Sequence, residues 1–281
     1  MDYKLGLYEK AMPAGLSWRE MLTSARDAGF DHLEISIDES DARQARLSWS
    51  EDERRELVKL SRDIGLPIRT MCLSGHRKYP LGSHDEQTRT RGMEMMREAV
   101  RLAGDLGIRV IQLAGYDVYY EDGDEQTRAW FVDNLRQSVE YAAQFGVALG
   151  FETMETAFMD TISKGMHYVR EVDSAYLGMY PDLGNLTNAA YLYGLAVLEE
   201  IRAGRGHIFA LHLKETKEGL YRDMDFGTGR VDFVPGIRAA LDMGVRMFTA
   251  EFWHDGSADW KGRLQRTNRF VRDRFAEAIA K

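Results

Sequence analysis

The feature that most constrains the fold is a unit that recurs along the chain: a helix-like stretch, a glycine, and then a short apolar run. The glycines at the centre of this unit are Gly29, Gly65, Gly107, Gly146, Gly178, Gly206 and Gly244. They lie 36, 42, 39, 32, 28 and 38 residues apart, which is the size of one βα unit. Because a glycine after a helix readily takes the left-handed cap conformation, each one predicts a helix end followed by a strand.

Eight strands are predicted in this way, including an opening run before the first glycine. They are expected at 4–8, 32–37, 68–73, 110–114, 147–151, 179–180, 208–211 and 247–250. The runs are largely apolar without strict alternation, which is typical of a parallel sheet covered by helices. Eight parallel βα units close most economically into a (β/α)8 TIM barrel, and a doubly wound open sheet is the alternative. With only five prolines and no low-complexity linker, residues 1–281 are expected to form a single domain.

Composition excludes several classes of protein. The 37 Lys and Arg residues against 45 Asp and Glu residues give a net charge of −8, which disfavours binding to nucleic acid or to an anionic membrane surface. No apolar run approaches the length of a membrane span, and the N-terminus lacks an apolar signal-peptide core. A single cysteine excludes a disulfide framework and a cysteine-based zinc cluster. We therefore expect a cytoplasmic globular protein.

Charged side chains stand at the ends of four consecutive predicted strands. Glu152, Asp182, His212 and Glu251 each lie in or directly after an apolar run, where an unpaired charge is costly. In a TIM barrel the carboxyl ends of the strands meet at one rim, which carries the active site. Pairing of each charge with a neighbouring Arg or Lys is the simpler interpretation for any one residue. For all four on adjacent strands, a shared site is the better interpretation.

These four residues have the chemistry of a metal site. Three carboxylates and one imidazole form a mixed oxygen and nitrogen ligand set that suits Mn²⁺, Mg²⁺, Co²⁺ or Zn²⁺. A cation would also offset the mutual repulsion of the carboxylates. The sequence therefore predicts one divalent metal ion, and the spacing does not decide among the four elements.

Four segments carry a resemblance to a known family. They are Leu7–Pro13 (LYEKAMP), Met71–Arg77 (MCLSGHR), Ile111–Tyr120 (IQLAGYDVYY) and Tyr180–Asn185 (YPDLGN). In these segments the chain resembles the L-ribulose-5-phosphate 3-epimerases, whose relatives act on L-xylulose 5-phosphate and which belong to the xylose-isomerase-like TIM barrels. The likeness runs from about residue 4 to about residue 270.

The resemblance implies an enzyme of L-ascorbate or pentose breakdown that inverts carbon 3 of a ketopentose 5-phosphate. It also implies that Glu152, Asp182, His212 and Glu251 hold the metal and that Glu152 and Glu251 transfer the protons. Free-sugar epimerases carry a His three residues after the Asp of strand 6. This chain has Asn185 there, as in the phosphate-using branch, so Asn185 is an expected substrate-binding residue.

The chemistry of such a reaction suits these residue types. One carboxylate would remove the C3 proton next to the carbonyl, a second would return a proton to the opposite face, and a divalent cation would act as Lewis acid. The substrate phosphate needs cationic donors, and His76, Arg77 and Lys217 are the expected ones. Further basic candidates are Lys78, Lys214 and the segment 226–230 (FGTGR).

The same sequence features also fit other functions. A free-ketose 3-epimerase and an aldose–ketose isomerase would use the same barrel, and a non-catalytic sugar-phosphate-binding protein would keep only the pocket. An endonuclease for abasic DNA is disfavoured by the negative charge and the scarcity of histidines at the rim. The expected partner is a small-molecule ketopentose phosphate, and a homodimer is the commonest assembly for such an enzyme.

Overall fold

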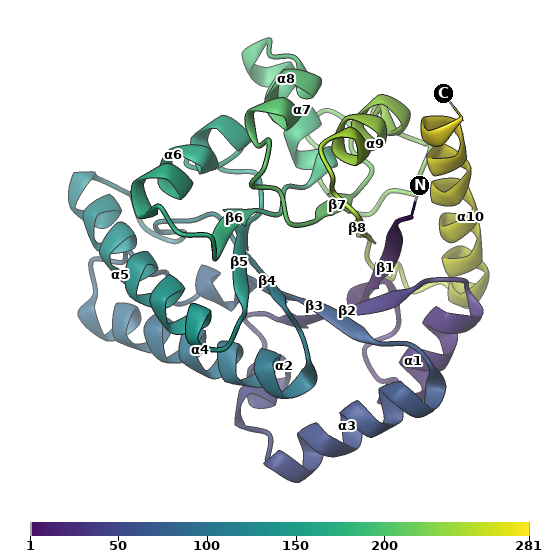
Figure 1. Cartoon of the computed structure of the whole chain (residues 1–281), viewed down its shortest axis with the longest axis horizontal. Helices are drawn as coiled ribbons and strands as arrows, with labels where there is room; N and C mark the ends of the chain where they lie inside the picture. Colours follow the sequence, from purple (N-terminus) through teal and green to yellow (C-terminus); the bar gives the residue numbers. More distant parts are fainter. Residues whose placement is uncertain (1, 281) are drawn as a thin grey trace.

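The computed structural model describes residues 2–280 and contains one eight-stranded parallel sheet (Figure 1). The strands are β1 (Lys4–Tyr8), β2 (His32–Ile37), β3 (Ile68–Leu73), β4 (Val110–Leu113), β5 (Ala148–Phe151), β6 (Leu177–Met179), β7 (Leu211–Leu213) and β8 (Met247–Ala250). Their order in the sheet is β6-β5-β4-β3-β2-β1-β8-β7, and every strand pair is parallel. Each strand therefore lies beside its neighbours in the sequence, as the recurring unit predicts.

The sheet closes on itself between β6 and β7. Two isolated parallel bridges, Met179 to Ile208 and Asp182 to His212, join the segments of these two strands. The backbone N–H of His212 donates to the Pro181 carbonyl at 2.9 Å. The predicted (β/α)8 barrel is confirmed, and the open doubly wound sheet is excluded.

Helices form a ring around the outside of the sheet, as Figure 1 shows. They are α1 (Trp18–Asp27), α2 (Asp41–Gln44), α3 (Glu51–Ile64), α4 (Glu86–Leu106), α5 (Glu125–Gln144), α6 (Ile162–Val172), α7 (Leu183–Tyr193), α8 (Val197–Ala203), α9 (Phe233–Asp242) and α10 (Trp260–Ile279). Three short 3₁₀ segments follow strands or a helix: η1 (Glu9–Ala11), η2 (Ala45–Ser48) and η3 (Ser74–Arg77). Within residues 2–280 no helix is long and apolar enough to cross a bilayer.

Local sequence fixes where several helices begin and end. Ser50 starts α3 with a capping box, in which its side chain accepts from the N–H of Glu53 and the Glu53 carboxylate accepts from the N–H of Ser50. Gly65 ends the same helix with a φ of 81°, and Gly107 ends α4 with a φ of 76°. These caps confirm the predicted helix–glycine–strand unit at both positions.

Gly178 departs from this pattern. The glycine lies inside β6 rather than after a helix, and Asp173 ends α6 with a φ of 51°. A Cβ atom at position 178 would lie 2.3 Å from the carbonyl oxygen of His207, so the neighbouring segment leaves room only for glycine. The predicted helix cap is therefore wrong, although the strand is close to its expected place.

The two shortest strands are also displaced from their predicted limits. The structure has β6 at Leu177–Met179 instead of 179–180, and β7 at Leu211–Leu213 instead of 208–211. The apolar residues 208–210 precede β7 and contact β6 through a single bridge at Ile208. As a consequence, His212 lies within β7 rather than after it.

A layer of polar side chains crosses the inside of the barrel below its rim. Glu34 of β2 accepts from the Tyr180 hydroxyl at 2.7 Å and contacts the His212 ring, while Thr249 of β8 lies 2.9 Å from the same hydroxyl. Gln112 of β4 contacts His212 from another side. All five side chains are fully buried. Because these contacts join β2, β4, β7, β8 and the residue after β6, the layer helps to fix the strands that carry the candidate site.

Candidate active site

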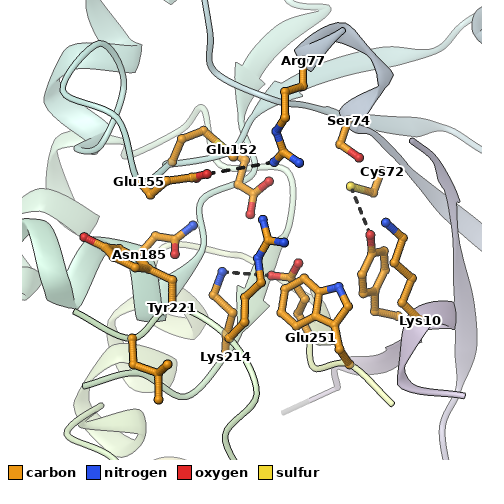
Figure 2. Close-up of a pocket in the computed structure, with 15 residues that line it drawn as sticks. Lys10, Cys72, Ser74, Arg77, Glu152, Glu155, Asn185, Lys214, Tyr221 and Glu251 are labelled. Carbon is orange, nitrogen blue, oxygen red and sulfur yellow. Dashed lines mark hydrogen bonds and ion pairs between the residues drawn. The ribbon is translucent and has the colours of Figure 1, made fainter. Parts of the chain in front are cut away.

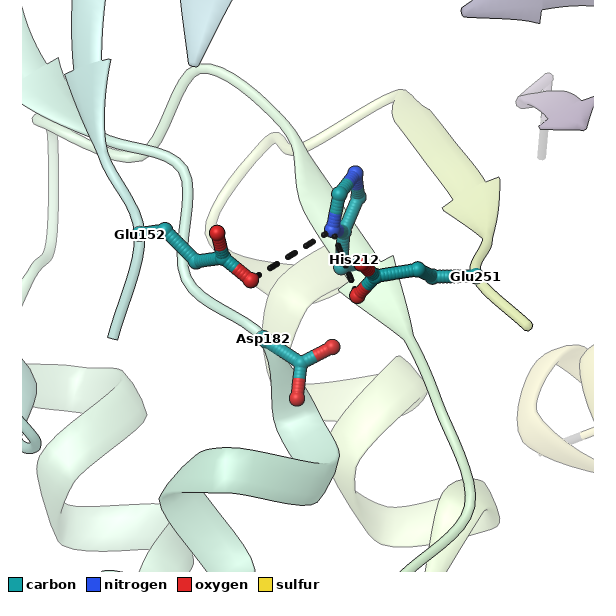
Figure 3. Close-up of side chains that lie close together, drawn as sticks. All are labelled: Glu152, Asp182, His212 and Glu251. Atoms are coloured by element: carbon teal, nitrogen blue, oxygen red, sulfur yellow. Dashed lines mark hydrogen bonds and ion pairs between the residues drawn. The ribbon is translucent and has the colours of Figure 1, made fainter. Parts of the chain in front are cut away.

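The four predicted rim residues lie together at the carboxyl ends of the strands (Figure 3). One ligand atom from each of Glu152, Asp182, His212 and Glu251 lies within 4.8 Å of the others. All four are buried, with at most 5% of any of them exposed. In Figure 3 Glu152 and Glu251 reach the centre of the group from opposite sides. The cluster predicted from the strand ends is therefore present.

Each member of this cluster is positioned by the element that carries it. Glu152 is the first residue after β5, and Glu251 is the first after β8. Asp182 is the N-cap of α7, and its Oδ1 accepts from the backbone N–H of Asn185 at 2.6 Å. His212 is the middle residue of β7. The close approach therefore follows from the parallel sheet and from one helix cap.

Glu34 orients His212 from below. The His212 Nε2 lies 2.6 Å from Glu34 Oε1, whereas Nδ1 lies 3.1 Å from Glu251 Oε2 and 3.9 Å from Glu152 Oε1. One ring nitrogen thus donates to Glu34, and the other faces the two carboxylates at the rim. A carboxylate behind a histidine is a common arrangement around protein metal ligands, because it fixes the ring and its tautomer. Sequence analysis did not single out Glu34.

Lys214 adds a positively charged side chain to the cluster. Its Nζ lies 3.4 Å from Asp182 Oδ1 and 3.4 Å from Glu251 Oε2, and the residue is buried. Burial works against the charged ammonium, but these carboxylates raise the pKa of Lys214 above its ordinary value. Lys214 was considered as a phosphate ligand from the sequence, whereas the structure pairs it with the carboxylates.

The surroundings drive the carboxylate pKa values in different directions. Burial raises the pKa of Glu152, and the nearby Glu251 charge adds to the rise. Burial also raises the pKa of Asp182, to about 7, although Lys214 opposes it. At Glu251 the effect of burial is outweighed by Lys214 and His212, so its pKa lies well below the usual range. Glu152 is thus the easier of the two glutamates to protonate.

The residues present fit a divalent cation. Asp182 Oδ2 is buried without a hydrogen-bond partner, and so is Asn185 Oδ1 beside it. An unpaired buried oxygen is costly, and a cation or a ligand hydroxyl would satisfy it. Three carboxylates and an imidazole also form a donor set that first-row and alkaline-earth divalent cations accept. This buried group could therefore hold a metal ion.

A cavity of about 320 Å³ opens above the cluster (Figure 2). In Figure 2 Arg77 and Lys214 enter it from opposite sides with Glu152 between them, and Glu251 lies beside Lys214. Its charged and amide lining residues are Lys10, Arg77, Glu152, Glu155, Asn185, Lys214, Arg222 and Glu251. Carboxylates lie at the base of the cavity, and Lys and Arg side chains lie around it. This lining suits a small polar anion better than an apolar ligand.

The structure brings only part of the predicted substrate-binding set to this cavity. Arg77 and Asn185 line it. His76 is buried outside it, with its ring Nε2 3.1 Å from the Gly92 carbonyl oxygen. Lys217 is exposed in the loop after β7 and lies outside the cavity lining. Neither residue is therefore placed to contact a ligand in the cavity, because the His76 ring packs against α4 and Lys217 projects from a turn.

Sequence reasoning missed several lining residues that come from loops. Lys10 lies in η1 after β1, and Tyr221 and Arg222 lie between β7 and α9. Their place depends on how these loops fold back over the rim. Trp253 is different, because it lies two residues after the rim residue Glu251, so its place in the lining can be expected from the sequence.

Comparison with known proteins places the fold and the site in a family. Residues 22–274 match the family described as xylose isomerase-like TIM barrel. The chain is 42% identical over 275 residues to L-ribulose-5-phosphate 3-epimerase UlaE of Salmonella paratyphi A, covering 98% of this chain and 95% of the relative. The chain belongs to the L-ribulose-5-phosphate 3-epimerase family. UlaE of Salmonella heidelberg, at 41% identity over the same coverage, agrees.

Membership of the L-ribulose-5-phosphate 3-epimerase family confirms the resemblance that four short segments indicated. Solved structures agree with the family fold. A structure of L-ribulose 3-epimerase has a TM-score of 0.81 at 20% identity and covers 99% of this chain and 96% of its own. A xylose isomerase-like TIM barrel protein from Mycobacterium smegmatis, in complex with magnesium, has a TM-score of 0.71 at 18% identity, covering 99% of this chain and 98% of its own. At these identities the likeness concerns the fold alone.

Proposed function

We propose that this protein is a metal-dependent epimerase that inverts carbon 3 of a ketopentose 5-phosphate, interconverting L-ribulose 5-phosphate and L-xylulose 5-phosphate. The observation that carries the proposal is the pair Glu152 and Glu251, which approach one point from opposite sides beside Asp182 and His212. The name of the relatives at 42% identity supports the choice of substrate.

Two carboxylates on opposite sides supply the proton transfers that inversion requires. The C3–H bond is weakened by the adjacent C2 carbonyl, so one ionised carboxylate takes this proton and the electron pair of the bond moves toward the carbonyl oxygen as an enediolate forms. The other glutamate, in its protonated form, then gives a proton to the opposite face of C3. Glu152 and Glu251 suit these exchanged roles because they reach one point from opposite sides.

Glu152, Asp182, His212 and Glu251 would hold the divalent cation. Such an ion supplies Lewis-acid stabilisation of the negative charge that develops on the ketose oxygens. Lys214, 3.4 Å from Asp182 and from Glu251, helps to position these two carboxylates and favours their charged forms. The protein therefore contributes a buried set of metal ligands and two glutamates that transfer protons.

Asn185 and Arg77 would contact the sugar above this cluster. Asn185 donates its amide Nδ2 to the Thr153 carbonyl at 2.8 Å, which leaves Oδ1 without a donor and facing the lining of the cavity. A substrate hydroxyl would satisfy that oxygen. Arg77 lines the cavity, donates to the Tyr116 hydroxyl at 3.3 Å and pairs with Glu39 and Glu155, while its Nε has no hydrogen-bond partner. Both roles follow from groups that the protein alone leaves incompletely paired.

A panel of ketopentose 5-phosphates and the corresponding free ketopentoses tests this function. We expect L-ribulose 5-phosphate to be converted to L-xylulose 5-phosphate, activity to disappear after exhaustive chelation, and activity to return with Mn²⁺, Zn²⁺, Co²⁺ or Mg²⁺. Full activity of the metal-stripped protein would contradict the metal requirement. Binding without any conversion would identify a sugar-phosphate-binding protein instead.

A further inference from the structure

Glu215 is a buried carboxylate that the proposed reaction does not use. The residue is 2% exposed and follows Lys214, but it is not among the residues that line the cavity. Within residues 2–280 no Lys, Arg or His side chain pairs with it within 4.0 Å. A buried carboxylate is costly unless other groups donate hydrogen bonds to its oxygens, so the donors around Glu215 show what it holds in place.

The donors are backbone N–H groups from both ends of the loop between β7 and α9. Glu215 Oε1 accepts from Thr216 and from Val231, both at 3.1 Å. Its Oε2 accepts from Gly227 at 2.8 Å. Thr216 begins the loop, whereas Gly227 and Val231 belong to its last part, before α9. The N–H of Arg230 also donates to the Thr216 carbonyl at 2.9 Å. One side chain therefore joins the two ends of this loop.

Two glycines let the end of the loop approach this carboxylate. Gly227 has a φ of 83°. A Cβ atom at Gly229 would lie 2.3 Å from Glu215 Oε1 and 2.3 Å from the Thr216 carbonyl oxygen. Both glycines belong to the segment 226–230, which the sequence offers as a phosphate-binding candidate. In the structure the N–H of Gly227 already donates to Glu215, so this glycine pair accommodates a carboxylate of the protein itself.

The middle of the same loop forms one wall of the cavity. Leu220, Tyr221 and Arg222 line it. The Thr216 hydroxyl donates to the Leu220 carbonyl at 2.7 Å, which connects this wall to the start of the loop. Glu215 in turn fixes the start of the loop against its end. The position of the wall thus depends on a carboxylate that does not line the cavity.

We propose that Glu215 is a positioning residue for the epimerisation, which keeps the loop 216–231 closed against the cavity; this inference rests on the proposed function. Glu215 acts through the loop and not on the reacting atoms, because it is absent from the cavity lining. A wall that is in place before the substrate binds need not be ordered at that moment. If the loop spent time open, the apparent affinity for substrate would fall in proportion to the closed fraction. Saturating substrate would select the closed loop, so turnover would be preserved.

Glu215→Gln tests this role, with Glu218→Gln as the matched control from the same loop. Glutamine keeps one oxygen for two of the backbone donors, but its amide NH2 group cannot accept from the third. We expect KM for L-ribulose 5-phosphate to rise by about 10-fold or more, the usual effect of losing a hydrogen bond to a charged group, while kcat stays within about twofold of the wild type. Glu218 is exposed, so Glu218→Gln should leave both constants unchanged.

Gly229→Ala disrupts the same contact from the other side. Its Cβ atom would displace Glu215 and the Thr216 carbonyl, so it should raise KM in the same way, even where Glu215→Gln folds poorly. A folded Glu215→Gln protein with a wild-type KM would overturn the positioning role. A loss of kcat at an unchanged KM would overturn it as well, because the residue would then act on the chemical step.

Amide hydrogen exchange separates the failure of this inference from the failure of the proposed function. It is measured by mass spectrometry on the wild type and the three variants without substrate. Peptides from 217–231 should exchange faster in Glu215→Gln and Gly229→Ala than in the wild type, and at the wild-type rate in Glu218→Gln. Faster exchange in these two variants, with no epimerase activity in the wild type, would overturn the proposed function and keep the role of Glu215 in holding the loop. Unchanged exchange in both would overturn that role.

Discussion

Glu152 and Glu251 are identical side chains that the fold places in different electrostatic surroundings. Glu251 Oε2 has His212 Nδ1 at 3.1 Å and Lys214 Nζ at 3.4 Å, whereas the nearest ring nitrogen lies 3.9 Å from Glu152. The Lys214 ammonium and the His212 ring therefore favour the charged form of Glu251 more than that of Glu152. Two glutamates on opposite sides of one point are the arrangement that a two-base inversion requires.

Replacing each glutamate by glutamine separates the two proton transfers. Glutamine keeps the shape and an oxygen, but it cannot accept a proton. We expect both Glu152→Gln and Glu251→Gln to lose net epimerisation by about 10²- to 10⁴-fold, the usual effect of losing an acid–base group. Each variant should still exchange the C3 proton of one epimer with solvent D₂O, and the two variants should differ in which epimer exchanges.

Both glutamates are also proposed metal ligands, so the metal content of each variant must be measured alongside. A metal-replete variant that epimerises at a near wild-type rate would refute the two-base scheme. If one glutamate proved essential for exchange from both epimers and the other dispensable, a single base would be indicated.

Burial of His32 should make the free energy of unfolding depend on pH, and this effect does not involve the active site. Burial lowers the pKa of His32 to about 4, and both of its ring nitrogens lack hydrogen-bond partners beneath Gly6. The folded protein keeps this ring neutral, whereas the unfolded chain binds a proton below about pH 6.5. Its contribution to the free energy of unfolding is thus present above pH 6.5 and decreases by about 3 kcal/mol as the pH falls to about 4.

Denaturant unfolding of His32→Gln from pH 7 to pH 4 checks this. The variant should be less stable than the wild type at pH 7, and the difference should shrink by about 3 kcal/mol at pH 4 because its side chain does not titrate. His167→Gln, at an exposed position of α6, serves as the control and should follow the wild-type curve. Parallel curves for His32→Gln and the wild type would contradict the assignment.

At the scale of elements, β2 and β7 form a coupled pair through Glu34 and His212. The 2.6 Å contact to Nε2 leaves Nδ1 as the ring atom that faces the rim carboxylates. We expect Glu34→Gln to weaken binding of Mn²⁺ or Zn²⁺ by about 10- to 100-fold, since losing such a supporting carboxylate typically has this effect. Competition with a chelating dye measures the affinity directly.

Tyr180→Phe provides the graded comparison for that prediction. It removes the hydroxyl that donates to Glu34 at 2.7 Å but leaves the contact with His212 intact. Its metal affinity should therefore lie between those of the wild type and Glu34→Gln. Wild-type affinity in a folded Glu34→Gln protein would show that Glu34 does not support the ligand.

The same elements explain which site residues could be predicted from the sequence. Glu152, Asp182, His212 and Glu251 stood out because a charge near the end of an apolar strand has one natural place in a barrel. Glu34 is also a charged residue within an apolar run, HLEISI. It lies in the middle of the strand and not at its end, so the strand-end pattern does not identify it. Arg222 gave no signal, because its position depends on the Glu215 contacts that fold its loop back.

At the scale of the whole molecule, the recurring unit was sufficient to predict the barrel. Parallel pairing between successive strands leaves few ways to bury eight apolar strands. Closing the sheet also pairs the backbone N–H and C=O groups of the two edge strands. The errors fell on β6 and β7, the two shortest strands, where the ring closes through isolated bridges instead of a continuous ladder. Short strands carry little apolar pattern, so their limits depend on tertiary contacts.

The central claim is that the four-residue cluster catalyses metal-dependent inversion at C3. The most direct measurement is ¹H NMR of L-ribulose 5-phosphate in D₂O with the metal-loaded protein, and again after chelation. We predict that L-xylulose 5-phosphate appears with deuterium at C3, that the other carbon-bound protons are retained, and that chelation stops both changes. An unchanged C3 proton with the metal-loaded protein, or exchange at C1 with formation of an aldose, would contradict the account.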